Sequence, residues 1–113
     1  MKKLYIVKNQ YDFDRIIKKN DITKNTSFII YKEKNNLPYS RFGISVGKKL
    51  GNAVYRNKMK RKIRDIIDKT NKQSIESNDY IIILRKMAQN AEYKKLKEDL
   101  EKLLYKERNR NEN

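Results

Sequence analysis

Apolar residues recur at helical spacing in three parts of the chain. Over residues 9–19, over residues 52–69 and from residue 90 onward they return every three or four positions, as along one face of a helix. An asparagine able to cap a helix stands at the start of each stretch: Asn9, Asn52 and Asn90. The sequence therefore predicts three amphipathic helices, whose inner faces consist of Phe13, Ile16 and Ile17; Tyr55, Met59, Ile63, Ile66 and Ile67; and Tyr93, Leu96, Leu100, Leu103 and Leu104.

Three further segments have the composition of strands. Residues 26–33 contain a β-branched and aromatic run, and residues 41–47 alternate between apolar and other positions. Residues 79–85 contain a continuous apolar run, typical of a central strand buried on both faces. Turn-forming residues at 34–38 predict a hairpin between the first two strands. The order α-β-β-α-β-α predicts an α+β fold, a two-layer α/β sandwich around a small sheet.

Length and composition limit the class of protein. With 113 residues, we expect one domain over residues 1–113, with a frayed polar tail over 107–113. No apolar run is long enough for a secretory signal or a bilayer span, so we expect a cytoplasmic protein without a membrane partner. The chain has no cysteine and no histidine, which excludes a Cys/His mechanism and thiolate or imidazole metal ligands. Carboxylates could still bind a metal ion, but the acidic residues are dispersed among basic ones and form no cluster near the basic segment, so we expect no metal site on the polypeptide.

Positive charge is concentrated in one part of the chain. Lys and Arg number 29 against 14 Asp and Glu, a formal charge of +15 that favours a polyanionic partner. A lysine-rich coding bias could produce the total charge, but its distribution is more specific. Between Glu33 and Asp65 there are ten basic residues and no acid, and four of the eight arginines lie there. In a lysine-rich chain, arginine at these positions indicates bidentate contacts with external phosphates or base edges. The four are Arg41, Arg56, Arg61 and Arg64.

The helix over residues 52–69 carries a basic face beside its apolar face. Arg56, Lys60 and Arg64 follow one another at i, i+4, a spacing at which like charges destabilise an isolated helix. An external anion such as phosphate is the simplest explanation for such a stripe without nearby acids. All three glycines lie in the same region, which indicates either close approach to the backbone, as by a ligand, or positive φ angles. The glycines are Gly43, Gly47 and Gly51.

The segment from Lys48 to Arg64 closely resembles a known signature. Its sequence, KKLGNAVYRNKMKRKIR, is similar to the arginine-rich motif of the bacterial ribonuclease P protein subunit, and the resemblance extends over about residues 5–106. It implies an α/β sandwich with a left-handed βαβ crossover, similar to the second domain of ribosomal protein S-five. Other matching segments are Asp12–Phe13, Phe28–Tyr31, Gly43–Val46 and Asp79–Ile83.

The resemblance also implies a function. Members of this family assist a catalytic RNA that removes the 5′ leader of precursor tRNA, so the enzyme is an endoribonuclease whose chemistry belongs to RNA. The implied partners are the ribonuclease P RNA subunit and precursor tRNA, with no DNA and no small-molecule ligand. Mg²⁺ would serve the RNA and not a dedicated protein site, and no catalytic residue is expected on this chain.

The resemblance assigns two sets of residues. The 5′-leader cleft would contain Phe13, Ile17 and Tyr31. Ile17 departs from the family, which often has an aromatic residue there, and Gly47 stands where many members have serine. A missing aromatic removes a stacking platform worth about 1–3 kcal/mol per base. The RNA-binding signature would contain Lys48, Lys49, Asn52, Arg56, Asn57, Lys60, Arg61 and Arg64.

Two alternative functions remain open at the level of sequence. One is a ribosomal or other structural RNA-binding protein that uses the same basic helix as a clamp. The other is a stand-alone nuclease that uses carboxylates such as Asp65 and Asp68. For Phe13 and Tyr31, a role in the hydrophobic core is the alternative to a role in the leader cleft.

Overall fold

The computed structural model describes residues 1–105, and the tail predicted over residues 107–113 lies outside them. The helices are α1 (Gln10–Lys19), α2 (Ala53–Lys69) and α3 (Tyr93–Leu104). The strands are β1 (Ile22–Lys24), β2 (Phe28–Lys34), β3 (Arg41–Ser45) and β4 (Asn78–Leu84). Short 3₁₀ turns are η1 (Lys3–Tyr5), η2 (Lys48–Leu50), η3 (Lys72–Ser74) and η4 (Lys86–Ala88).

The three predicted helices and three predicted strands are present, with small differences at their ends. The side chains of Asn9 and Asn52 accept hydrogen bonds from the first turns of α1 and α2, as expected for N-caps. The prediction for Asn90 is wrong, because the residue at the N-cap of α3 is Glu92, without a side-chain capping bond. Strand β1 was not predicted, since its three residues are all exposed and show no apolar alternation.

The four strands form one sheet in the order β1-β2-β4-β3. The predicted hairpin between β2 and β3 is therefore wrong, because β4 lies between them. Strand β4 pairs antiparallel with β2 and parallel with β3, which makes it the central strand that its apolar run predicts. The turn residues at 34–38 reverse the chain without pairing the strands that they connect.

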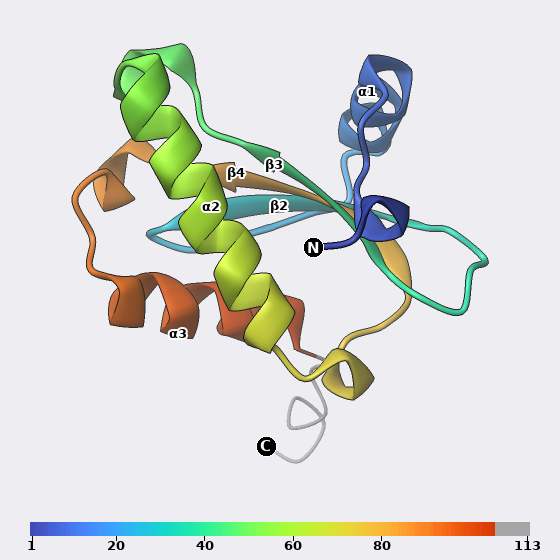
Figure 1. The fold of residues 1–113 in the computed structure, drawn as a ribbon. Coiled ribbons are helices and arrows are strands. Elements are labelled where there is room, and N and C mark those ends of the chain that lie inside the picture. The colour runs from blue at the N-terminus through green and yellow to red at the C-terminus, as the bar shows by residue number, and fades with distance from the viewer. Residues whose placement is uncertain (106–113) are drawn as a thin grey trace.

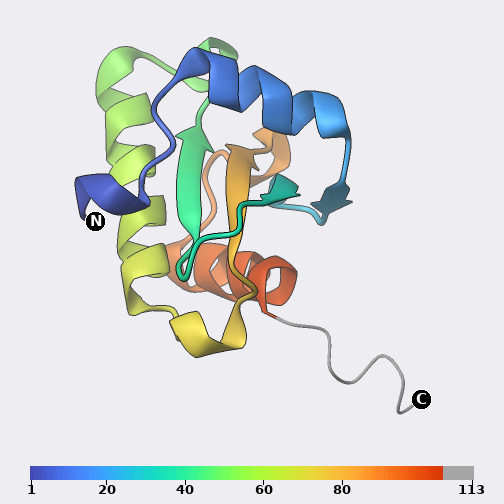
Figure 2. The same ribbon diagram turned by 90° about the vertical axis from the view of Figure 1, so that its right-hand side faces the viewer.

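Helices lie on both sides of this sheet (Figures 1 and 2). Helices α2 and α3 form a layer on one face, and α1 crosses the other face. In Figure 2, β3 and β4 both point upward with β4 on the right, and α2 packs on the face turned away from α1. The β3–α2–β4 connection is therefore a left-handed crossover, as the resemblance implied.

Most of the core lies between the sheet and the α2/α3 layer. One cluster of seventeen buried residues fills this space, with Phe28 and Ile30 of β2 pointing into it. On the other face, the apolar cluster between α1 and the sheet has three buried members among residues 1–105: Val7, Ile16 and Ile81. No helix within residues 1–105 combines the length and apolar character needed to cross a bilayer.

Candidate RNA interface

Helix α2 presents its apolar stripe to the core and its basic stripe to solvent. Met59, Ile63, Ile66 and Ile67 are buried, as the helical wheel predicts. The eight residues predicted to bind RNA all lie on α2, on its cap or on the preceding turn η2. Six of them are exposed and Arg56 and Lys60 are half-buried; the exposed ones are Lys48, Lys49, Asn52, Asn57, Arg61 and Arg64.

The basic residues of this surface are not neutralised by the protein itself. Within residues 1–105, none of its six lysines and arginines forms a salt bridge. On α3, by contrast, Lys95 and Lys97 pair with acids one turn away. We call the eight residues predicted to bind RNA the α2 basic surface: Lys48, Lys49, Asn52, Arg56, Asn57, Lys60, Arg61 and Arg64.

Arg56 also has a buried hydrogen-bond donor without a partner in the part of the protein that the structure describes. Its Nε is buried and has no hydrogen-bond partner among residues 1–105. A buried, charged donor without an acceptor costs about 1–3 kcal/mol or more, so native proteins seldom retain one without a reason. An anion bound at this end of α2 would reduce that cost.

Arg41 differs from the other three arginines of the acid-free segment. Its Nε donates to Oδ1 of Asp79 at 2.8 Å and its Nη2 to Oδ2 at 2.5 Å. These hydrogen bonds raise the pKa of Arg41 above its usual value. The interpretation that all four arginines are kept for external anions is therefore wrong for Arg41, whose acidic partner lies 38 positions later in the chain.

The turn that carries Lys48 and Lys49 is held by contacts from Gln89, the residue that follows η4. Gln89 donates its side-chain amide to the carbonyl of Leu50 and accepts the hydroxyl of Tyr55 at its own carbonyl. The Tyr55 ring lies so close to Gly51 that a Cβ there would be 2.6 Å from Tyr55 Cδ2. Sequence reasoning missed Gln89, because nothing in its local sequence indicates a contact 39 residues away.

Two of the glycines, Gly51 and Gly43, lie where another part of the protein packs closely against the backbone. A Cβ on Gly43 would lie 2.6 Å from Cζ of Phe13 and 2.9 Å from Cδ1 of Ile81. Gly47 has open space around it, and within residues 1–105 no glycine has a positive φ in the left-handed range. The expected close approach is thus made at Gly43 by the ring of Phe13.

The three predicted leader-cleft residues lie together on the α1 face of the sheet. Phe13, Ile17 and Tyr31 are all half-buried and pack, with Ile83, around the small apolar cluster beneath α1. These three side chains are therefore only partly buried in the hydrophobic core. Each leaves part of its surface available to a ligand.

A cavity connects this face with the α2 basic surface. It has a volume of about 280 Å³, and its lining includes Lys8, Phe13, Ile44 and Arg64. Ile17 and Tyr31 lie outside it, farther along α1 and β2. Phe13 and Arg64, which sequence reasoning placed in two separate sites, thus meet at one hollow with apolar walls and two cations.

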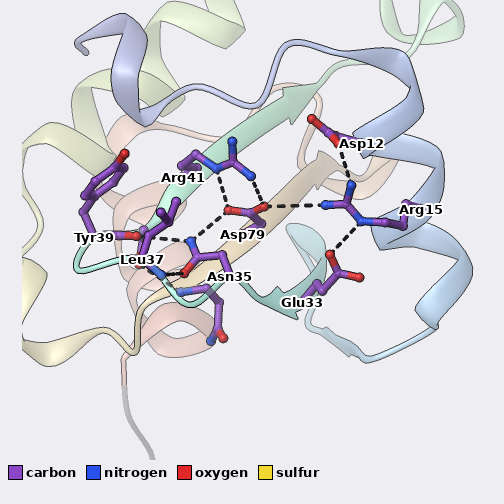
Figure 3. A network of polar contacts seen from close by, with 10 residues as sticks. Asp12, Arg15, Glu33, Asn35, Leu37, Tyr39, Arg41 and Asp79 are labelled. Atoms are coloured by element: carbon purple, nitrogen blue, oxygen red, sulfur yellow. Dashed lines mark hydrogen bonds and ion pairs between the residues drawn. The ribbon is translucent and has the colours of Figure 1, made fainter.

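A polar network anchors α1 along the edge of this face (Figure 3). Arg15 of α1 donates Nε to Glu33 at 2.8 Å and Nη1 to Asp12 at 2.5 Å, and its Nη2 lies 3.8 Å from Oδ2 of Asp79. The bonds to Glu33 and then Asp12 raise the pKa of Arg15. Asp79 also accepts from Arg41 and from Asn35, the latter at 2.9 Å. We call Asp12, Arg15, Glu33, Asn35, Arg41 and Asp79 the Asp79 network.

The carboxylates of the alternative nuclease site are committed to structural contacts. Asp65 accepts the hydroxyl of Tyr93 at 2.6 Å and lies 3.2 Å from Nζ of Lys69. These contacts lower the pKa of Asp65. Asp68 lies 3.2 Å from the amino group of Met1. Residues 1–105 contain no group of three or more acidic side chains arranged to hold a metal ion.

Comparisons with known proteins agree over most of the chain. A family profile described as Ribonuclease P matches residues 1–108. A ribonuclease P protein component of Streptococcus pyogenes serotype M5 (strain Manfredo) is 44% identical over 104 residues, 92% of this chain and 87% of that protein. The RNase P protein of Staphylococcus aureus matches with a TM-score of 0.79 and 40% identity, over 87% of this chain and 90% of that one. For the RNase P protein of Thermotoga maritima the TM-score is 0.80 and the identity 34%, over 87% and 93%. The chain therefore belongs to the family of ribonuclease P protein components, the protein subunits of ribonuclease P.

Proposed function

We propose that the α2 basic surface binds the RNA subunit of ribonuclease P and that the face beneath α1 receives the 5′ leader of precursor tRNA. The holoenzyme would remove this leader as an endoribonuclease. The observation that carries the proposal is the row of six cations on α2 and η2 without acidic partners in residues 1–105. Because precursor tRNA is processed in the bacterial cytoplasm, we assign the protein to that compartment.

The contribution of α2 would be electrostatic. Arg56, Lys60 and Arg64 form a stripe that follows the helix axis, and Arg61 and Asn57 stand beside it. Guanidinium groups donate two parallel hydrogen bonds to a phosphate, and each phosphate neutralised releases counterions into solution. Neutralising repulsion where two RNA molecules meet would strengthen the binding of substrate without any protein group entering the chemistry.

The half-buried side chains under α1 suit a single-stranded leader. Phe13 and Tyr31 offer aromatic surface on which unpaired bases can stack, and base stacking tolerates many sequences. The cavity that joins Phe13 to Arg64 would let a strand pass from the leader cleft toward the α2 basic surface. Tyr31 is thus proposed as a leader contact, and Ile17 as an apolar wall.

Catalysis is assigned to the RNA subunit and its Mg²⁺. Asp65 and Asp68 are engaged by Tyr93, Lys69 and the amino terminus, which supports a structural role for both. The protein would therefore hold no dedicated Mg²⁺ site. Membership of the family disfavours the ribosomal alternative.

Reconstitution tests the proposal. The full chain, purified free of RNA, is mixed with precursor tRNA at low salt and low Mg²⁺, with and without its cognate RNA subunit. We expect cleavage at the leader junction only when the RNA subunit is present, and at lower Mg²⁺ than the RNA alone requires. Cleavage by the polypeptide alone would establish a nuclease, and an RNA subunit whose activity does not respond to the protein would favour a structural RNA-binding role.

A further inference from the structure

The Asp79 network contains a carboxylate that is almost completely buried. Asp79 lies on the central strand β4, and its side chain is only 1% exposed. Burying a charge is costly unless it is paired and hydrogen-bonded. Asp79 meets this requirement with two bonds from Arg41, one from Asn35 and the nearby guanidinium of Arg15. Three side chains, from Arg41, Asn35 and Arg15, therefore converge on one carboxylate.

The register of the sheet places this carboxylate directly beside the leader cleft. Glu33, Asp79 and Arg41 are paired across β2, β4 and β3. The next row on the same face lies two positions farther along each strand and contains Tyr31, Ile81 and Gly43. That row contains the cleft residue Tyr31 and the glycine beneath Phe13. The network thus occupies the row of side chains adjacent to the proposed leader contacts.

Helix α1 separates the network from the cleft. At 3.6 residues per turn, Phe13 and Ile17 lie on one flank of the buried Ile16. Asp12 and Arg15 lie on its other flank, where they join the network (Figure 3). One long side of α1 is therefore tied to the sheet by ion pairs, while its other side carries Phe13 and Ile17 of the proposed leader cleft.

Apolar packing alone gives α1 little support. Within residues 1–105, the apolar cluster between α1 and the sheet has three buried residues, Val7, Ile16 and Ile81, whereas the apolar cluster on the opposite face has seventeen. Arg15 meets three carboxylates, and it is the residue of α1 that reaches both β2 and β4 with ion pairs. The placement of Phe13 on the sheet thus depends on these ion pairs as well as on apolar packing.

The network is also unsuited to binding the leader itself. Its three carboxylates and two arginines sum to a charge of −1 in a chain of +15. A phosphate backbone would be repelled here, and both guanidinium groups already have acidic partners. The leader is therefore directed to the other flank of α1.

We propose that Asp79, acting through Arg15 and Arg41, is a positioning residue for leader recognition. It sets the placement of α1 over Gly43 and thereby the width of the cleft between Phe13, Ile17 and Tyr31. This inference rests on the proposed function, because it concerns the same leader site. It assigns specificity to a residue that would touch no nucleotide.

The test compares two buried aspartates. Asp79→Asn keeps the size of the side chain but removes the charge that is hydrogen-bonded to Arg41 and lies 3.8 Å from Nη2 of Arg15. The matched control is Asp99→Asn on the opposite face, where Asp99 is also buried and accepts hydrogen bonds from Ser27 and Lys95. Each protein is assembled with the cognate RNA subunit, and its affinities for leader-bearing precursor and mature tRNA are measured well below its melting temperature.

We expect both variants to unfold at lower temperature and both to retain RNA-subunit affinity. Asp79→Asn should reduce the ratio of precursor to mature tRNA affinity about tenfold, equivalent to about 1.4 kcal/mol, and Asp99→Asn should leave that ratio unchanged. An unchanged ratio in Asp79→Asn, or an equal loss in Asp99→Asn, would overturn the inference.

Arg15→Gln provides a second route if Asp79→Asn fails to fold. Arg15 is 36% exposed, so its replacement disturbs the core less while releasing α1 from the sheet. We expect a smaller loss of the same ratio and its partial rescue in Arg15→Lys; no loss in Arg15→Gln would also overturn the inference. A wild-type holoenzyme that does not distinguish precursor from mature tRNA would instead contradict the proposed function.

Discussion

The two faces of the sheet are stabilised by different means. On the α2/α3 face, seventeen buried residues form a continuous apolar core, and α2 contributes four of them. On the α1 face, three buried residues, several half-buried apolar side chains and the Asp79 network hold a single helix. A large core gives a rigid support for the charges of the α2 basic surface. A thin, partly open layer leaves apolar and aromatic side chains accessible to a flexible strand.

Truncating one isoleucine on each face tests this difference most strongly. Ile63 is fully buried in the large core, so Ile63→Ala should reduce the free energy of unfolding by about 2–5 kcal/mol. Ile17 lies on α1 and is half-buried against the small apolar cluster, so Ile17→Ala should cost about 1 kcal/mol or less. Urea denaturation at neutral pH measures both, and equal losses would contradict the proposed asymmetry.

A methyl group at Gly43 should disturb the α1 face by overpacking. The Cβ of Gly43→Ala would meet the ring of Phe13 and the side chain of Ile81, so we expect about 1–3 kcal/mol of destabilisation together with weaker leader binding. Gly47→Ala is the matched control, because Gly47 has open space around it and a φ of −64°. It should be neutral or slightly stabilising. Equal behaviour of the two variants would show that Phe13 is not seated on β3 as described.

The salt dependence of RNA-subunit binding tests the role of the α2 basic surface. Arg61 is exposed and has no acidic partner in residues 1–105, so Arg61→Ala should reduce the slope of log affinity against log salt by about 0.7–0.9 for each phosphate that Arg61 neutralises. Lys97 of α3 is paired with Glu101, and Lys97→Ala should leave the slope unchanged. Titration of labelled RNA subunit at several KCl concentrations gives both slopes; the same slope for Arg61→Ala and wild type would exclude a phosphate contact.

The smallest expected effect concerns the contact between α2 and α3. Tyr93 and then Lys69 lower the pKa of Asp65, so the folded protein favours the ionised carboxylate more than the unfolded chain does. This contribution to stability is present above the ordinary carboxyl pKa and disappears as the pH falls through the lowered folded value. Wild type should therefore lose slightly more stability than Asp65→Asn between about pH 6 and pH 3 in urea denaturation. Parallel losses would show that the hydrogen bond to Tyr93 does not favour the charged form.

Features that depend on neighbouring residues in the chain could be predicted from the sequence. The basic and apolar stripes of α2 follow from helical spacing alone, and the structure places both as the spacing predicts. The continuous apolar run of β4 likewise predicted its central position. The cap at Asn52 needed only the next three residues.

Features that depend on distant residues could not be predicted in the same way. The turn at 34–38 gave no sign that β4 would separate β2 from β3. Arg41 looked like Arg61 because its partner, Asp79, is remote in the sequence. Gly43 indicated a close approach, but the partner proved to be Phe13, thirty positions earlier.

The central claim is that the two faces bind two different parts of the RNA assembly, and a pair of variants tests it directly. Arg61→Ala and Tyr31→Ala are each combined with the cognate RNA subunit, and two quantities are measured: affinity for that subunit and the preference for leader-bearing precursor over mature tRNA. Tyr39→Ala, at another half-buried tyrosine that packs against Tyr5, serves as the control. We predict that Arg61→Ala weakens only the first quantity, that Tyr31→Ala weakens only the second, and that Tyr39→Ala changes neither. Loss of both quantities in both variants would contradict the division of the molecule into two binding faces.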